Sequence, residues 1–152
     1  MKQWLVLAGF IALCLAVGSF AGMVTAPAVA DWYQSLAKPS WQPPTWLFAP
    51  VWTVLYIMMA VAAWLVWKAG NAGTALLLWF AQLALNFAWS LLFFGARSPG
   101  LALIEVAVFW LAIAATIFAF SFKSRTAMAL MVPYLCWVSF AAVLNAAIVM
   151  LN

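Results

Sequence analysis

The chain is a succession of five long apolar segments, separated by stretches that hold most of the polar residues. The segments span residues 4–26, 46–67, 74–95, 100–122 and 127–150. Each is close to the ~20 residues that an α-helix, rising about 1.5 Å per residue, needs to cross a bilayer. The eight charged residues lie at or near the ends of these segments: Lys2, Asp31, Lys38, Lys68, Arg97, Glu105, Lys123 and Arg125. The pattern predicts five transmembrane helices.

Composition points the same way. Hydrophobic residues make up 71% of the chain and charged residues 5%, whereas an ordinary soluble domain carries about 25% charged residues. A water-soluble fold is therefore excluded, and we expect an all-α integral membrane protein. The connections after the first are short, and short connections join antiparallel neighbours. The sequence predicts a single domain over residues 1–152, built as a compact five-transmembrane-helix bundle.

The basic residues favour one orientation in the membrane. The net charge is +4, but the basic residues are scattered singly and form no stripe that would bind nucleic acid. Because five crossings alternate sides, four basic residues share the side of the N-terminus and two share the other side. An excess of Lys and Arg marks the cytoplasmic side, which predicts a cytoplasmic N-terminus if the protein lies in an inner membrane; the sequence leaves inner and outer membrane both open. The two groups are Lys2, Lys68, Lys123 and Arg125, against Lys38 and Arg97.

The first connection, expected over residues 27–45, is the only long one and is rich in tryptophan and proline. We expect Pro27 to end the first helix, because the residue before a proline disfavours helical geometry. Trp41 and the pair Pro43 and Pro44 follow, and prolines stiffen a segment by fixing φ. The connection is interpreted as a stiff aromatic lid. The alternative is an aromatic anchor at the membrane surface.

Three apolar segments each carry aromatic and polar or small residues on one helical stripe. Residues three or four apart share a face of a helix, and an amide inside a membrane must find partners or face a cavity. Interhelical hydrogen bonding is one use of such amides, and a pocket for a small molecule is the other. The three sets are Trp52 and Tyr56; Gln82, Asn86 and Trp89; and Trp137, Ala141 and Asn145.

Other chemistry is limited by the residues present. The chain has no histidine, which excludes histidine general bases, histidine haem ligation and zinc sites with histidine. Its two cysteines lie in apolar segments, and we expect no metal site. Gly18 and Gly22 have the GxxxG spacing that lets helices approach closely, inside the bundle or across a dimer. Glu105 is shallow enough to reach the interface or pair with Arg97.

These residues resemble the tryptophan-rich sensory protein family, TspO, known in mitochondria as the translocator protein or peripheral benzodiazepine receptor. The resemblance runs in order along nearly the whole chain. The matching stretches are Trp32-Tyr33, Lys38-Pro39-Ser40-Trp41-Gln42-Pro43-Pro44, Pro50-Val51-Trp52, Leu55-Tyr56, Gln82-Leu83-Ala84-Leu85-Asn86, Phe93-Phe94-Gly95-Ala96-Arg97, and Pro133-Tyr134-Leu135 through Trp137 and Phe140-Ala141 to Leu144-Asn145.

The resemblance implies a bacterial membrane protein, usually a homodimer, with a pocket beneath the first connection that takes porphyrins. It needs no resident cofactor. The pocket positions carried over from the family are Tyr33, Pro43, Trp52, Tyr56, Asn86, Trp89, Trp137 and Ala141. From their own pattern we add Trp41 and Asn145 as ligand-binding residues. The cholesterol motif of mammalian members is broken here, since residues 142–152 contain neither tyrosine nor a basic residue.

Three functions follow as hypotheses. The first is binding of protoporphyrin-like tetrapyrroles inside the bundle, in their transport or in sensing and regulation. The second is a light-dependent porphyrin-degrading oxidase, in which the resemblance implicates Trp52 and Trp137. The third is a structural membrane subunit without a ligand. Apart from a porphyrin, membrane lipid and a second copy of the chain, no partner is expected.

Overall fold

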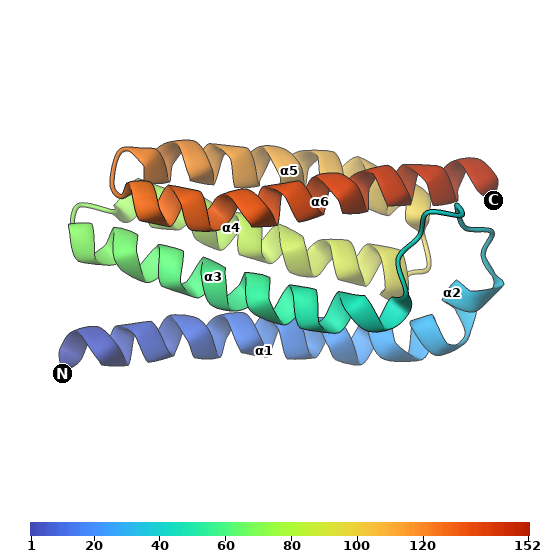
Figure 1. Cartoon of the computed structure of the whole chain (residues 1–152), viewed down its shortest axis with the longest axis horizontal. Coiled ribbons are helices and arrows are strands. Elements are labelled where there is room, and N and C mark those ends of the chain that lie inside the picture. The colour runs from blue at the N-terminus through green and yellow to red at the C-terminus, as the bar shows by residue number, and fades with distance from the viewer.

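The computed structural model describes residues 1–152 and consists of helices joined by connections without regular structure (Figure 1). Five helical stretches are long and apolar enough to cross a membrane. The prediction of an all-α membrane protein with five spans is therefore confirmed. In chain order the elements are α1 (Lys2–Ala30), α2 (Trp32–Ser35), the 3-10 turn η1 (Thr45–Leu47), α3 (Phe48–Ala69), α4 (Gly73–Ser90), the π-helical turn η2 (Leu91–Gly95), α5 (Pro99–Ser121) and α6 (Arg125–Leu151).

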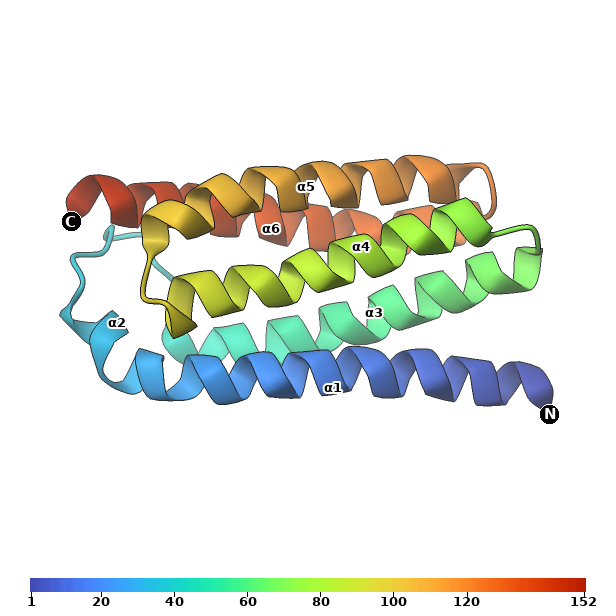
Figure 2. The same cartoon turned by 180° about the vertical axis from the view of Figure 1, so that it is seen from behind.

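The five long helices form a closed ring. α1 packs beside α3, α3 beside α6, α6 beside α5 and α5 beside α4, and α4 with η2 returns to α1 (Figures 1 and 2). Short connections join packed neighbours at α4–α5 and α5–α6, as expected. The α3–α4 link also joins antiparallel neighbours, which pack against each other less extensively.

The first helix is longer than the sequence predicted. Pro27 does not end it, because α1 continues to Ala30 with Pro27 inside. Proline removes only its own N–H from the helix, and its carbonyl still accepts a hydrogen bond from the backbone N–H of Asp31 at 3.2 Å. The first connection therefore covers residues 31–44 and includes the short helix α2.

The charged side chains lie at the two ends of the bundle, with one exception. The N-terminus and the α3–α4 and α5–α6 links share one end, while the first connection and the C-terminal end share the other (Figure 1). At that second end Arg97 approaches Asp31 at 3.7 Å. Of the two possibilities for Glu105, the interface or a pair with Arg97, the structure shows neither: both carboxylate oxygens of Glu105 are buried and have no hydrogen-bond partner.

The interior is filled in one half of the bundle and hollow in the other. Toward the α3–α4 link the core is dense, and Met59, Trp79 and Phe120 are fully buried. Toward the first connection the buried cluster is smaller; it consists of Tyr33, Phe93, Ala102, Leu144 and Ile148. The outer surface is apolar in both halves, which suits acyl chains and not water. A cavity occupies the hollow half.

Candidate functional site

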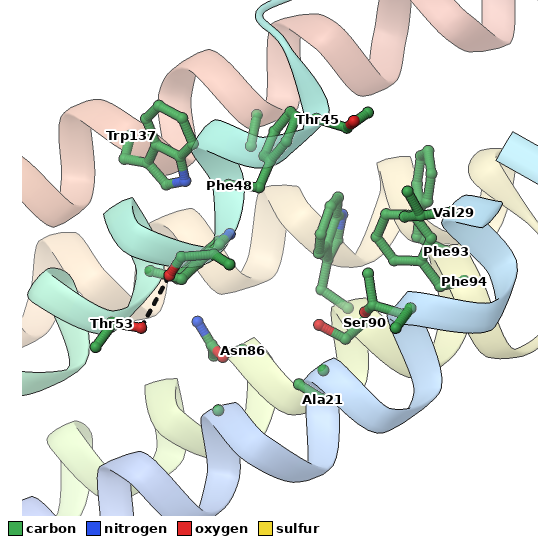
Figure 3. A pocket seen from close by; sticks show the side chains of 18 of the residues that line it. Ala21, Val29, Thr45, Phe48, Thr53, Asn86, Ser90, Phe93, Phe94 and Trp137 are labelled. Carbon is green, nitrogen blue, oxygen red and sulfur yellow. Dashed lines mark hydrogen bonds between the residues drawn. The ribbon is translucent and has the colours of Figure 1, made fainter. Parts of the chain in front are cut away.

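The cavity has a volume of about 480 Å³ and opens among α1, α3, α4, η2 and α6, beneath the first connection (Figure 3). This size is within the range of about 300–1,000 Å³ typical of small-molecule sites. None of the lining side chains is charged. The lining residues are Leu15, Gly18, Ser19, Ala21, Gly22, Thr25, Ala26, Val29, Tyr33, Thr45, Phe48, Ala49, Trp52, Thr53, Tyr56, Asn86, Trp89, Ser90, Phe93, Phe94, Trp137, Ala141, Leu144, Asn145 and Ile148.

The α1 wall is made of small residues, and its two glycines do different work. An added Cβ at Gly18 would lie 2.7 Å from Cε2 of Tyr56, so glycine is required for α1 to approach α3 this closely. An added Cβ at Gly22 would meet nothing within 4 Å. Gly22, Ser19 and Ala26 are exposed and line the cavity, as does Ala49 of α3. Of the two glycines of the GxxxG pattern, Gly18 therefore allows close packing of α1 against α3, whereas Gly22 borders the open space of the cavity.

A chain of buried hydrogen bonds forms the polar floor of the cavity, which Tyr56 and Asn86 line and which Tyr134 and Gln82 support without lining it. The hydroxyl of Tyr56 donates to Oδ1 of Asn86 at 2.5 Å, and Nδ2 of Asn86 donates to the Tyr134 hydroxyl at 3.1 Å. Tyr134 in turn donates to Oε1 of Gln82 at 2.8 Å. These groups link α3, α4 and α6, and all four side chains are buried. The interhelical hydrogen bonding predicted for the amides is confirmed at Asn86, which also lines the cavity (Figure 3).

A second amide supports the aromatic wall opposite the floor. Nε1 of Trp89 donates to Oδ1 of Asn145 at 3.2 Å, and Nδ2 of Asn145 donates to the carbonyl of Pro99 at 2.8 Å. Because Asn145 is bonded on both sides, it fixes the orientation of the Trp89 indole. The ring of Trp89 stacks on Phe93, with centroids 5.2 Å apart.

Two indoles face the cavity from different helices. Trp52 of α3 packs against the ring of Tyr56, with centroids 5.8 Å apart. Trp137 of α6 lies beside Phe48, with centroids 5.9 Å apart (Figure 3). Nε1 of Trp137 is buried and has no hydrogen-bond partner, although a buried indole N–H usually has one. The cavity wall thus carries a donor that the protein itself does not satisfy.

The π-helical turn η2 carries two consecutive aromatic residues, Phe93 and Phe94, that line the cavity. The backbone N–H of Ala96 donates to the carbonyl of Leu91 at 2.7 Å, five residues earlier. Phe93 and Phe94 continue the stripe of Asn86, Trp89 and Ser90, at i, i+3, i+4, i+7 and i+8, so one face of α4 and η2 lines the cavity. π-Turns of this kind are frequent at functional sites.

Lys38 organises the first connection from within. Its ammonium donates to the carbonyls of Tyr33, Gln34 and Leu36 at 2.7, 3.2 and 2.9 Å, and lies 5.0 Å from the centroid of the Tyr33 ring. All three N–H donors of the ammonium are used by these carbonyls, so Lys38 stabilises the backbone of the first connection and has no donor left for a ligand. Burial raises the pKa of Tyr33 to about 12, and its hydroxyl therefore stays neutral at the cavity edge.

Comparison with known proteins identifies the family. The model of the TspO/MBR family matches residues 10–151. The chain belongs to the TspO/MBR family. A relative from Chlorobaculum tepidum, the tryptophan-rich protein TspO, is 49% identical over 99% of this chain and 98% of its own length.

Other relatives extend the family likeness to distant organisms. The tryptophan-rich sensory protein of Cereibacter sphaeroides is 40% identical over 99% of this chain and 93% of its own length. The human translocator protein is 44% identical over 75% of this chain and 70% of its own length. The recognised resemblance to TspO is therefore confirmed.

In this TspO/MBR protein most of the predicted site residues meet at the cavity. Eight of them line it: Tyr33, Trp52, Tyr56, Asn86, Trp89, Trp137, Ala141 and Asn145. Trp41 and Pro43 do not line it; Trp41 is 48% exposed and packs edge-on against Phe140, with centroids 5.9 Å apart. Their role in ligand binding stays a prediction.

Sequence reasoning missed several parts of the site, among them Phe48, Phe93 and Phe94, and two further parts are informative. One is Tyr134, the centre of the hydrogen-bonded floor, whose place one helical turn from Trp137 was a usable signal. The other is the α1 wall from Leu15 to Val29, where the lining consists of small side chains. Such a wall carries no aromatic residue that would mark it in the sequence.

Proposed function

We propose that this membrane protein binds flat hydrophobic tetrapyrroles of the porphyrin class in the cavity, in their transport or in sensing and regulation. The observation that carries the proposal is an uncharged cavity in which indoles from α3, α4 and α6 face a common space. An apolar macrocycle suits aromatic walls. Because no lining residue is charged, the carboxylates of a porphyrin would stay at the mouth, near the membrane surface.

A titration of the protein in lipid nanodiscs with protoporphyrin tests the proposal. We expect saturable quenching of tryptophan fluorescence, with one site per chain and no such signal from empty nanodiscs. Ala141→Phe fills the cavity and is expected to raise Kd at least tenfold, because the new ring occupies the ligand's space. Val143→Phe, on the 59% exposed face of the same helix, is the matched control and should leave Kd unchanged. Quenching that rises linearly and does not saturate would contradict the proposal.

A second candidate, light-dependent oxidation of a bound porphyrin by dioxygen, is favoured by the position of Trp52 and Trp137. Both indoles line the cavity and would lie against the macrocycle. Under illumination in air, we expect this activity to give a discrete tetrapyrrole product, separable by chromatography, and Trp52→Phe to abolish it while binding persists. Loss of porphyrin colour without a defined product would mean photobleaching and would exclude this function.

The same proposal includes an orientation. The basic residues Lys2, Lys68, Lys123 and Arg125 belong to the end of the bundle that holds the N-terminus. By the preference of Lys and Arg for the cytoplasmic side, we place this end in the cytoplasm of a bacterial cell. The cavity, at the opposite end, would then exchange ligands on the outer side of that membrane.

A further inference from the structure

The first connection has few ties to the rest of the bundle. Its backbone hydrogen bonds stay within residues 27–47, and the side chains of Gln34, Ser35 and Lys38 also bond locally. The ion pair between Asp31 and Arg97 is exposed, and exposed pairs of this kind stabilise little. The first connection is held to the bundle by aromatic packing on both sides of residues 36–40, by Tyr33 against Phe93 before them and by Trp41 against Phe140 after them. Within residues 36–40 a hydrogen-bonded tie adds to this packing.

That tie is made by Asn152, the residue that follows α6. Its Oδ1 accepts a hydrogen bond from the backbone N–H of Ala37 at 3.0 Å, and its Nδ2 donates to the carbonyl of the same residue at 2.9 Å. Nδ2 also donates to the carbonyl of Ile148 at 2.8 Å, one turn earlier in α6. The amide is therefore oriented by its own helix and holds both backbone groups of Ala37.

The hydrogen bonds between Asn152 and Ala37 lie close to residues that line the cavity. Tyr33 and Thr45, on either side of Ala37 in sequence, both line the cavity, and so does Ile148. Figures 1 and 2 show the first connection running from α2 to the C-terminal end of α6 and back to η1, across this end of the bundle. Moving Ala37 away from Asn152 would release the middle of the segment that covers the cavity.

We propose that Asn152 acts as a latch, which holds the first connection closed over the cavity and sets the rate at which ligands enter and leave. The inference rests on the proposed binding of ligands in this cavity. The tie joins protein groups alone, and the Asn152 amide is not among the cavity-lining groups. Weakening the latch therefore speeds entry and exit alike, and leaves affinity unchanged.

Stopped-flow mixing of protoporphyrin with the protein in nanodiscs measures both rates. Asn152→Ala is expected to raise kon and koff about fivefold each, the effect of losing about one net hydrogen bond, with Kd within about twofold of the original. Asn152→Asp keeps the acceptor for Ala37 but loses the donor, and should give a smaller rise. Gln34→Ala is the matched control: its exposed amide bonds only to the nearby Val29 carbonyl, and both rates should be unchanged.

Two outcomes overturn the latch. Unchanged rates in Asn152→Ala would mean that ligands exchange elsewhere, such as between the small exposed residues of α1 and α3. A rise in koff alone, with weaker affinity, would make Asn152 a contributor to binding and not a latch.

Amide hydrogen exchange in the ligand-free protein separates this inference from the proposed function. Asn152→Ala is expected to speed exchange at residues 36–40, because the Ala37 N–H loses its acceptor, and to leave the α3–α4 link unchanged. If protoporphyrin does not bind the wild-type chain, the proposed function fails while this readout still decides the latch. Unchanged exchange at residues 36–40 would overturn the latch itself.

Discussion

Gly18→Ala is expected to lower the free energy of unfolding by about 2 kcal/mol, within the range for overpacked cores. The new methyl group would lie 2.7 and 2.9 Å from Cε2 and Cδ2 of Tyr56. That ring cannot move aside easily, because it is buried and its hydroxyl is bonded to Asn86. α1 must therefore move away from α3. Reversible unfolding in mixed micelles, followed by circular dichroism, measures the change.

Gly22→Ala is the matched control for Gly18→Ala. It has the same chemistry, four residues later in the same helix, yet its methyl group meets nothing within 4 Å. We expect a change below about 0.5 kcal/mol. Truncating the ring with Tyr56→Ala should also relieve most of the cost of Gly18→Ala, which a double-mutant cycle detects as coupling. Equal losses at Gly18 and Gly22 would instead indicate that both glycines serve a contact between copies of the chain.

Helical periodicity explains what could be predicted of the site. Trp137, Ala141 and Asn145 lie four residues apart, and such spacing places side chains on one face regardless of what that face contacts. All three line the cavity. Asn86 and Trp89 follow the same rule on α4. The lengths of the apolar segments predict the helices. Which residues share a face then follows from the geometry of each helix alone, without knowledge of its neighbours.

In the first connection, residue spacing no longer predicts which side chains reach the cavity. Trp41 and Pro43 lie outside any helix, and spacing along an irregular segment does not say which way a side chain points. Trp41 packs against Phe140 of α6, a contact set by tertiary structure. Tryptophan and proline content predicted a stiff covering segment, but it could not predict which of its aromatic residues would reach the cavity. The Asn152 tie, between residues 115 positions apart, had no local signal either.

The other failures have the same origin. Pro27 was expected to end α1, but a proline removes one hydrogen bond, and a helix in a membrane gains more by continuing to satisfy its other backbone groups. The π-turn at η2 depends on one extra residue in a turn, which hydropathy does not report. Phe93 and Phe94, which both line the cavity, lie within this turn.

The largest effect on ligand binding is expected from Trp52→Ala and Trp137→Ala, each raising Kd for protoporphyrin at least tenfold, or about 1.4 kcal/mol. Both indoles line the cavity, and each large ring removed takes away apolar surface that a bound macrocycle would bury. Phenylalanine at either position should keep part of that surface and lose less affinity. Titration in nanodiscs, read from porphyrin fluorescence, gives Kd for each variant.

Trp46→Ala tests whether these losses belong to the cavity and not to tryptophan in general. Trp46 lies in η1, at the same end of the bundle, but is 71% exposed and does not line the cavity. A porphyrin that merely partitions into the membrane against surface aromatics would lose as much affinity at Trp46 as at Trp52. A porphyrin enclosed between α3 and α6 is insensitive to Trp46, so equal effects at the three positions would contradict binding inside the bundle.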